Sequence, residues 1–151
     1  MTKRRMEDFA MNIRFERSDS MKIQLIDGQE KYLSSKEKIK EALKQANHIG
    51  LDIYDGSELI GFAMLRKYDP YGWFLWDFAI DGEVQNRGYG RESLNRLIAY
   101  MKEEYGAKEI STTYIWGNEV AKRLYEKAGF EETDVVDEPD CHEVDMVLRV
   151  K

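Results

Sequence analysis

The order of periodic segments in the second half of this chain constrains its fold more than any other feature. An aromatic, strand-like run, Trp73–Ile80, leads into an amphipathic helical pattern over Glu92–Tyr105. A strand pattern at Glu109–Tyr114, a helical pattern at Asn118–Ala128 and a strand pattern at Phe130–Val136 follow. Strands that alternate with helices in this way imply at least one parallel pairing through a right-handed crossover. The sequence therefore predicts an α/β fold with a mixed sheet.

The rest of the chain adds mainly antiparallel strands. Met11–Arg17 alternates weakly and is a candidate first strand. Ile49–Tyr54 and Glu58–Arg66 flank Asp55-Gly56, which is the composition of a tight primed hairpin turn. Val144–Val150 is expected to be the last strand.

One further helix is expected before these strands. Ser34 and Glu37 have the spacing of a capping box, which predicts that the helix begins at Ser34. Residues 19–32 are ambiguous, with a short helix that ends near Asp27-Gly28 as one alternative. In the helix that begins at Ser34, the apolar residues at helical spacing are Ile39, Ala42, Leu43 and Ala46. In the last helix, the residues expected to face inward are Val120, Ala121, Leu124 and Ala128.

Length and composition place the chain among ordinary globular proteins. With 151 residues it suffices for one complete core and is short for two, so a single domain over residues 1–151 is expected. Met1–Asp8 lacks the apolar segment of a secretory signal, and no stretch approaches the ~20 apolar residues of a membrane span. The single cysteine, Cys141, favours a reducing cytoplasm. Two distant histidines, His48 and His142, give no indication of a metal site.

The net charge of -6 is distributed unevenly, because acidic residues crowd the end of the chain. A solvated acidic edge and an electrostatic funnel for a cationic substrate are both compatible with this pattern. Nucleic acid is disfavoured as a partner, since no basic stripe with interleaved aromatic residues occurs. The acidic residues are Glu131, Glu132, Asp134, Asp137, Glu138, Asp140, Glu143 and Asp145.

The segment Val84–Arg91 joins the aromatic strand to the helix that follows it. Gly88 and Gly90 carry no Cβ atom that would keep a ligand away from the backbone. The first helical turn offers unpaired N–H groups and the positive end of the helix dipole, and Arg87 and Arg91 add donors and charge. This pattern predicts a polyanionic cofactor, against the alternative of a loop that leads into a helix and binds nothing.

Two familiar nucleotide-binding motifs do not explain this segment. The sequence contains no G-x-x-x-x-G-K-[ST], which excludes a P-loop. A dinucleotide fingerprint would have glycine or alanine where Ser93 stands, and would lie near the first strand of a doubly wound fold.

Two motifs resemble those of the GNAT N-acetyltransferases. Gln85–Gly90 fits the [QR]-x-x-G-x-[GA] loop that grips the acetyl-CoA pyrophosphate in that family. Asn118–Phe130 is similar to its second conserved block and follows in the expected order. The resemblance, which covers roughly residues 49–130, implies a GNAT fold: a mixed, mostly antiparallel, twisted sheet of about six to seven strands flanked by about four helices. It also implies acetyl-CoA as the acetyl donor, coenzyme A as the product, and no metal.

The resemblance assigns roles to individual residues. It implies that Asn118 contacts the pantetheine arm and that Tyr125 protonates the departing thiolate. Seven residues separate them, so they share one helix face about 10 Å apart along the axis. A phenol of pKa near 10 can supply a proton to a thiolate whose conjugate acid has a pKa near 8.5. The alternatives are a core aromatic for Tyr125 and a plain helix cap for Asn118.

The resemblance further implies that the end of the aromatic strand splays away from the next strand, so that its free backbone groups pair with the pantetheine amides. The candidate cofactor-binding residues are Phe78, Ala79, Ile80, Gln85, Asn86, Arg87, Gly88, Tyr89, Gly90, Arg91, Asn118 and Tyr125.

An acceptor amine has to lose a proton before it attacks, because alkyl amines have a pKa near 10.4. Asp77 is the nearest acidic candidate for this base, and an ion pair or a turn-facing carboxylate at a sheet edge is the alternative for it. The segments that look most similar to the bacterial spermine/spermidine acetyltransferases are Gln29–Ser35, Gly50–Tyr54, Leu59–Met64 and Asp77–Asp81. That similarity implies a small cationic amine as the acceptor, although this branch often has an acidic residue where Trp76 stands.

Other functions within the same resemblance remain open at this point. They are acetylation of a protein N-terminus or lysine, acetylation of an aminoglycoside, and a regulatory module that binds coenzyme A without turnover. The retention of Tyr125 argues against the regulatory module, and Trp76 argues mildly for it. Homodimers are common in the superfamily, so a homodimer is also an expectation by resemblance.

Overall fold

The computed structural model describes residues 11–151 and contains one seven-stranded sheet in the order β1-β2-β3-β4-β5-β7-β6. Only β4 and β5 run parallel, and every other neighbouring pair is antiparallel. The expected mixed, mostly antiparallel sheet is therefore confirmed. The charged segment Met1–Asp8, for which no secretory signal was expected, lies outside the described residues.

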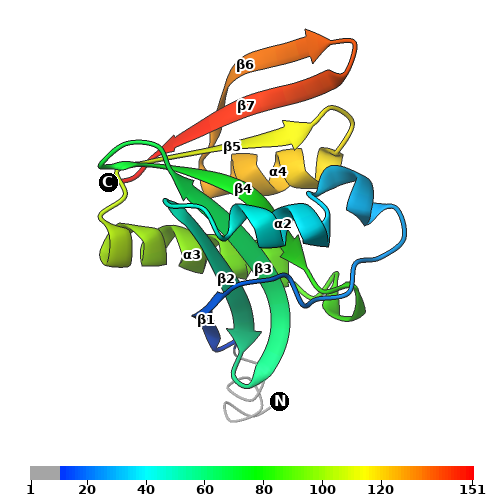
Figure 1. The fold of residues 1–151 in the computed structure, drawn as a ribbon, viewed down its shortest axis with the longest axis vertical. Coiled ribbons are helices and arrows are strands. Elements are labelled where there is room, and N and C mark those ends of the chain that lie inside the picture. Colours follow the sequence, from blue (N-terminus) through cyan, green and yellow to red (C-terminus); the bar gives the residue numbers. More distant parts are fainter. Residues whose placement is uncertain (1–10) are drawn as a thin grey trace, which may run out of the picture.

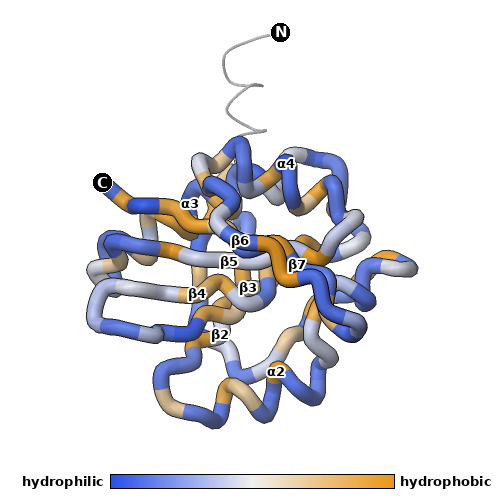
Figure 2. The backbone as a smooth tube through the Cα atoms, turned by 90° about the horizontal axis from the view of Figure 1, so that it is seen from above, coloured by the Kyte–Doolittle hydropathy of each residue, from blue (hydrophilic) through white to orange (hydrophobic). Residues whose placement is uncertain are grey.

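The helices cover the sheet on both faces. Figure 2 shows α3 and α4 on one face and α2 on the other. The strands are β1 (Ile13–Ser18), β2 (His48–Asp55), β3 (Glu58–Lys67), β4 (Gly72–Ile80), β5 (Glu109–Ile115), β6 (Glu131–Glu138) and β7 (Cys141–Arg149), as labelled in Figure 1. The helices are α2 (Lys36–Ala42), α3 (Tyr89–Tyr105) and α4 (Glu119–Ala128), with short 3-10 turns η1 (Gln29–Tyr32) and η2 (Gly82–Val84).

Two hydrophobic clusters hold these layers together. The larger cluster lies between the sheet and helices α3 and α4, and includes Leu65, Leu97 and Met146. The smaller one lies under α2 and includes Ile39 and Phe62. The fold is therefore packed on both faces of β3 and β4, as their nearly continuous apolar sequences require.

The N-cap of helix α2 lies one residue later than predicted. Ser35, not Ser34, is the N-cap, since its side chain accepts a hydrogen bond from the backbone N–H of Lys38. The N–H of Ser34 instead donates to the carboxylate of Asp77 at 3.0 Å. The prediction of a capping box from Ser34 to Glu37 is thus wrong. The reason is the tertiary contact between Ser34 and Asp77, which the local sequence does not reveal.

Left-handed glycines explain two other shifts in boundaries. Gly28 has a φ of 87° and begins the turn η1, so the alternative of a short helix that ends at Asp27-Gly28 is wrong. Gly88 has a φ of 85° and begins α3 at Tyr89, three residues before the predicted Glu92. Glycine reaches this region of φ without the steric penalty of a Cβ atom.

Two predictions about the late helix and strands need correction. Val120 does not face inward, because it is 81% exposed at the first turn of α4. Strand β7 begins at Cys141, three residues before the predicted Val144. Most acidic residues of β6 are exposed, which matches a solvated edge, and Asp137 contacts His142 at 2.7 Å.

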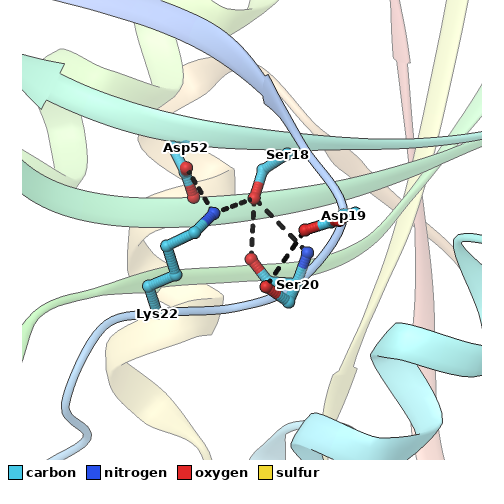
Figure 3. A network of polar contacts seen from close by, with 5 residues as sticks. All are labelled: Ser18, Asp19, Ser20, Lys22 and Asp52. Atoms are coloured by element: carbon cyan, nitrogen blue, oxygen red, sulfur yellow. Dashed lines mark hydrogen bonds and ion pairs between the residues drawn. The ribbon is translucent and has the colours of Figure 1, made fainter.

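A polar network fixes the segment between β1 and α2 on the sheet. Lys22 Nζ donates to Asp52 Oδ2 at 3.0 Å and to Ser18 Oγ at 2.7 Å (Figure 3). Farther along, Gln24 exchanges hydrogen bonds with the segment Asp81-Gly82, at 3.0 and 2.7 Å. These contacts place residues 26–35 beside the end of β4.

None of the helices within residues 11–151 has the length and apolar character that crossing a bilayer requires.

Candidate active site

The parallel strands β4 and β5 part halfway along their length. They pair only where Gly72–Leu75 faces Glu109–Thr112. Beyond Leu75, β4 continues along β3 to Ile80, whereas β5 continues along β7 to Ile115. The predicted splay at the end of β4 is therefore present. It opens a cleft of about 1190 Å³ whose walls include the ends of both strands.

A β-bulge at Trp76 sets the direction of the side chains in this cleft. In the register with β3, Leu75 faces Leu65 and Asp77 faces Met64, so Trp76 is the extra residue. The bulge reverses the alternation of β4 after this point. Asp77 consequently lies on the same face as Met64 and α2, and Trp76 remains 41% exposed at the cleft. Bulges are common next to active sites, where they redirect side chains in this manner.

The loop before α3 forms a wall of the cleft that is suited to an anion. Helix α3 is 17 residues long, and no side chain of residues 11–151 caps its N-terminus. Its first N–H groups and the positive end of its dipole are therefore available to an anion. A Cβ atom at Gly90 would touch protein atoms only at 3.9 Å or more, so packing within the protein does not require glycine there. Of the predicted loop residues, all but Arg87 line the cleft: Gln85, Asn86, Gly88, Tyr89, Gly90 and Arg91.

Side-chain hydrogen bonds hold this loop in place. Tyr89 Oη donates to Asp55 Oδ2 at 2.6 Å, which raises the pKa of Tyr89 to about 12. Gln85 Nε2 donates to Gln29 Oε1 at 3.0 Å and to the carbonyl of Ile80 at 3.1 Å. The loop is thus tied both to the β2–β3 hairpin and to the segment that borders the other side of the cleft.

Tyr125 lies at the point where β4 and β5 separate. Its side chain is only 6% exposed and packs against Phe130 with ring centroids 5.5 Å apart. Burial raises the pKa of Tyr125 to about 12, the Thr112 hydroxyl opposes this shift, and the negative charge of Asp77 adds to it. Tyr125 belongs to the core, as one interpretation expected, and it also lines the cleft, so its place in the core does not exclude contact with a ligand.

Asn118 caps helix α4 and also lines the cleft. Its Oδ1 accepts a hydrogen bond from the N–H of Ala121 at 3.3 Å, so it caps α4. Like Tyr125, it lines the cleft. A capping role therefore does not exclude contact with a ligand.

Asp77 is a buried carboxylate with one free oxygen. It is 4% exposed on β4, the fourth of seven strands, and forms no ion pair within residues 11–151. The alternative of an ion pair or a turn at a sheet edge is therefore wrong. Oδ1 accepts from the N–H of Ser34, whereas Oδ2 has no hydrogen-bond partner among the described residues. Burial raises the pKa of Asp77, and the hydrogen bonds from Ser34 oppose that shift.

Several residues of the cleft were not candidates from the sequence. The lining of the cleft also includes Tyr32, Ser34, Thr113 and Glu143. Glu143 appeared in the sequence only as one of many late acidic residues, and Ser34 as an expected helix cap. Because these residues come from a loop and from two strands that meet only in the folded chain, no local pattern indicates them.

Comparison with known proteins decides the family. The model of the Acetyltransferase (GNAT) family matches residues 13–130. The chain belongs to this family. A spermine/spermidine N(1)-acetyltransferase of Bacillus subtilis (strain 168) is 32% identical over 111 residues, which are 66% of this chain and 71% of that protein.

Solved structures share the fold. A GNAT family acetyltransferase from Elizabethkingia anophelis with acetyl-CoA bound has a TM-score of 0.70 at 18% identity, covering 92% of this chain and 99% of its own. An aminoglycoside acetyltransferase in complex with coenzyme A and kanamycin has a TM-score of 0.72 at 18% identity. That match covers 91% of this chain and 95% of the aminoglycoside acetyltransferase chain. The family and the Bacillus subtilis relative identify the chain as an N-acetyltransferase.

Proposed function

We propose that this enzyme acetylates a primary amine of a small polycation of the spermidine and spermine type. The observation that carries the proposal is Oδ2 of Asp77, a buried carboxylate oxygen that has no hydrogen-bond partner among the described residues. Asp77 lines the cleft and lies close enough to Tyr125 for its charge to raise the phenol pKa. An ammonium group is the natural partner for such an oxygen. The Bacillus subtilis relative and the net charge of -6 support a polycationic acceptor.

The cofactor wall of the cleft would hold acetyl-CoA through several groups. The N–H groups at the start of α3 and the Arg91 side chain would bind the diphosphate. The free edge of Phe78–Ile80 and the Asn118 side chain would bind the pantetheine arm. Arg87, which does not line the cleft in this structure, would contribute at its rim.

Asp77 is proposed as the base. The acceptor arrives as an ammonium ion, which Oδ2 binds and deprotonates to the neutral amine. A raised pKa makes the carboxylate a stronger base than a free aspartate, and burial keeps water from competing for the proton. The hydrogen bond from Ser34 holds Oδ1 in place, so that Oδ2 remains directed to the amine.

Tyr125 is proposed as the acid that protonates the thiolate. The transfer forms one C–N bond and breaks one C–S bond, and the amine loses two protons. One reaches solvent by way of Asp77, and Tyr125 gives its phenol proton to the sulfur and regains one from the nitrogen. With a pKa of about 12 the phenol is a weaker acid than the free side chain assumed from the sequence.

The two residues act on each other electrostatically. The negative charge of Asp77 raises the pKa of Tyr125. When Asp77 takes the proton of the ammonium ion, this charge disappears, and the phenol becomes a better acid at the stage at which the thiolate leaves. The uptake of a proton by Asp77 thus favours the release of the phenol proton by Tyr125.

An assay of free thiol release tests the proposed acceptor. Spermidine, spermine, a lysine peptide, a peptide with a free N-terminus and an aminoglycoside are compared as acceptors with acetyl-CoA. The proposal predicts the highest kcat/KM for a polyamine. Preference for the peptides or for the aminoglycoside would refute the acceptor, and binding of coenzyme A without turnover of any amine would favour a regulatory module.

A further inference from the structure

Three carboxylates line the cleft, and they belong to Asp27, Asp77 and Glu143. Asp27 lies on the N-terminal side, where Lys31 and Lys38 outnumber it. The basic residues Arg91, Arg123 and Lys127 line the cofactor side. Both of these walls therefore carry net positive charge, so a second ammonium group of an acceptor held at Asp77 is attracted toward Glu143 of β7.

Strand β7 continues this acidic wall beyond the cleft. Val144 and Met146 are buried in the core cluster on the α3 and α4 side, so Glu143 and Asp145 lie on the opposite face of the sheet. Alternate residues of a strand are about 7 Å apart, which is comparable with the spacing of neighbouring ammonium groups in a linear oligoamine. Neither carboxylate forms an ion pair with a basic residue in the part of the chain that the structure describes.

A second, smaller cavity begins where Asp145 lies. It has a volume of about 340 Å³, and its lining includes Asp145 and the ring of Phe74. Thr113 lines both this cavity and the cleft, and it faces Asp145 across the β5–β7 pair. The two spaces therefore adjoin along β5, and β7 supplies a carboxylate to each.

The smaller cavity also contains a positive charge. Arg66 lines it, with its guanidinium 5.8 Å from the ring centroids of both Phe74 and Trp76. An acceptor with a carboxylate next to its second amine would find a partner in Arg66. By the same electrostatic argument Arg66 opposes an ammonium group in this cavity, so a polycationic acceptor binds there only because Asp145 attracts it more strongly.

We propose that Glu143 and Asp145 bind successive distal ammonium groups of a linear oligoamine whose reacting amine lies at Asp77. Asp77 is only 4% exposed, and its Oδ2, which has no hydrogen-bond partner among the described residues, marks the reacting end of this row. The inference rests on the proposed function and adds the direction in which the acceptor lies and the residues that determine its length.

Steady-state rates of the full chain with a graded series of acceptors test this inference. The series is butylamine, 1,4-diaminobutane, spermidine and spermine, with 2,4-diaminobutyrate as the acceptor that carries a carboxylate. Glu143→Gln is expected to lower the ratio of kcat/KM for 1,4-diaminobutane to that for butylamine roughly tenfold, the size of a charge-assisted hydrogen bond. Asp145→Asn is expected to lower the ratio for spermine to that for 1,4-diaminobutane.

Glu138→Gln is the matched control, because it removes one charge from an exposed position of β6 outside both cavities. Ratios that do not change in Glu143→Gln, or that fall equally in Glu138→Gln, would overturn the inference while turnover of amines upholds the proposed function. A preference for 2,4-diaminobutyrate over 1,4-diaminobutane would overturn it in favour of Arg66. Absence of turnover with every amine would overturn the proposed function, and the inference with it.

Discussion

Asp77→Asn is expected to change activity and stability in opposite directions. The asparagine keeps the size of the side chain and an oxygen that accepts from Ser34, but it cannot take a proton from the acceptor. A general base typically accelerates the reaction 10²–10⁴-fold, so kcat/KM with spermidine should fall by roughly a thousandfold. The affinity for acetyl-CoA should stay within about threefold, because the diphosphate wall is formed by other residues.

The stability change follows from the sign of the pKa shift. Burial raises the pKa of Asp77 above its value in the unfolded chain, so the protonated form is favoured by folding. Ionisation of this group therefore destabilises the fold as pH rises from the unfolded pKa through the folded one. Removing a buried, unpartnered charge should stabilise the protein by about 1 kcal/mol at pH 7, or roughly 2–4 °C in Tm.

The pH dependence provides a separate test of the same residue. The wild-type rate should rise with pH through the raised pKa of Asp77, because only the ionised carboxylate acts as a base. In Asp77→Asn this ascending limb should disappear. Asp140→Asn, in the exposed turn between β6 and β7, is the control and should keep rate, Tm and pH profile. Wild-type turnover in Asp77→Asn, or a lower Tm with an unchanged pH profile, would refute the role of Asp77 as the base.

Three further substitutions test the other parts of the site. Tyr125→Phe should lower kcat about a hundredfold or more with little change in acetyl-CoA affinity, and a normal rate in this variant would exclude Tyr125 as the acid. The pH profile of the wild-type rate should show no decrease caused by this phenol below pH 10, since the pKa of Tyr125 is about 12. In titration calorimetry, Gly88→Val should weaken acetyl-CoA binding at least tenfold, because it forces a β-branched residue to a φ of 85° at the start of α3. The control is Gly106→Val, at a φ of 65° at the other end of the same helix, which should lower stability but keep the affinity for acetyl-CoA. Tyr89→Phe should raise the KM for acetyl-CoA roughly fivefold, since it removes the hydrogen bond to Asp55 that holds the loop; an unchanged KM would show that the loop keeps its position without this bond.

Much of the fold could be predicted from the sequence because it follows from local patterns. The β2–β3 hairpin depends on Asp55-Gly56, and helix α4 on Asn118 at one end and Gly129 at the other. The parallel pair β4–β5 follows from the helix between them. These signals act within a few residues of one another, so the sequence displays them directly.

The features that the sequence did not reveal depend on contacts between distant segments. The bulge at Trp76 reverses the alternation of β4 and turns Asp77 to the α2 face, although the run Trp73–Ile80 is uniformly apolar apart from that aspartate. Ser34 was expected to cap α2, yet its N–H serves Asp77, which is 43 residues away. Glu143 could not be distinguished from its acidic neighbours until β7 was paired with β5.

A crystal structure of the complex with coenzyme A tests the central claim most directly. The account predicts that the diphosphate oxygens accept hydrogen bonds from the first N–H groups of α3, and that the sulfur lies within hydrogen-bond distance of Tyr125 Oη with Asp77 Oδ2 facing it across the splay of β4 and β5. A diphosphate bound away from the N-terminus of α3, or a sulfur beyond the reach of Tyr125, would contradict it.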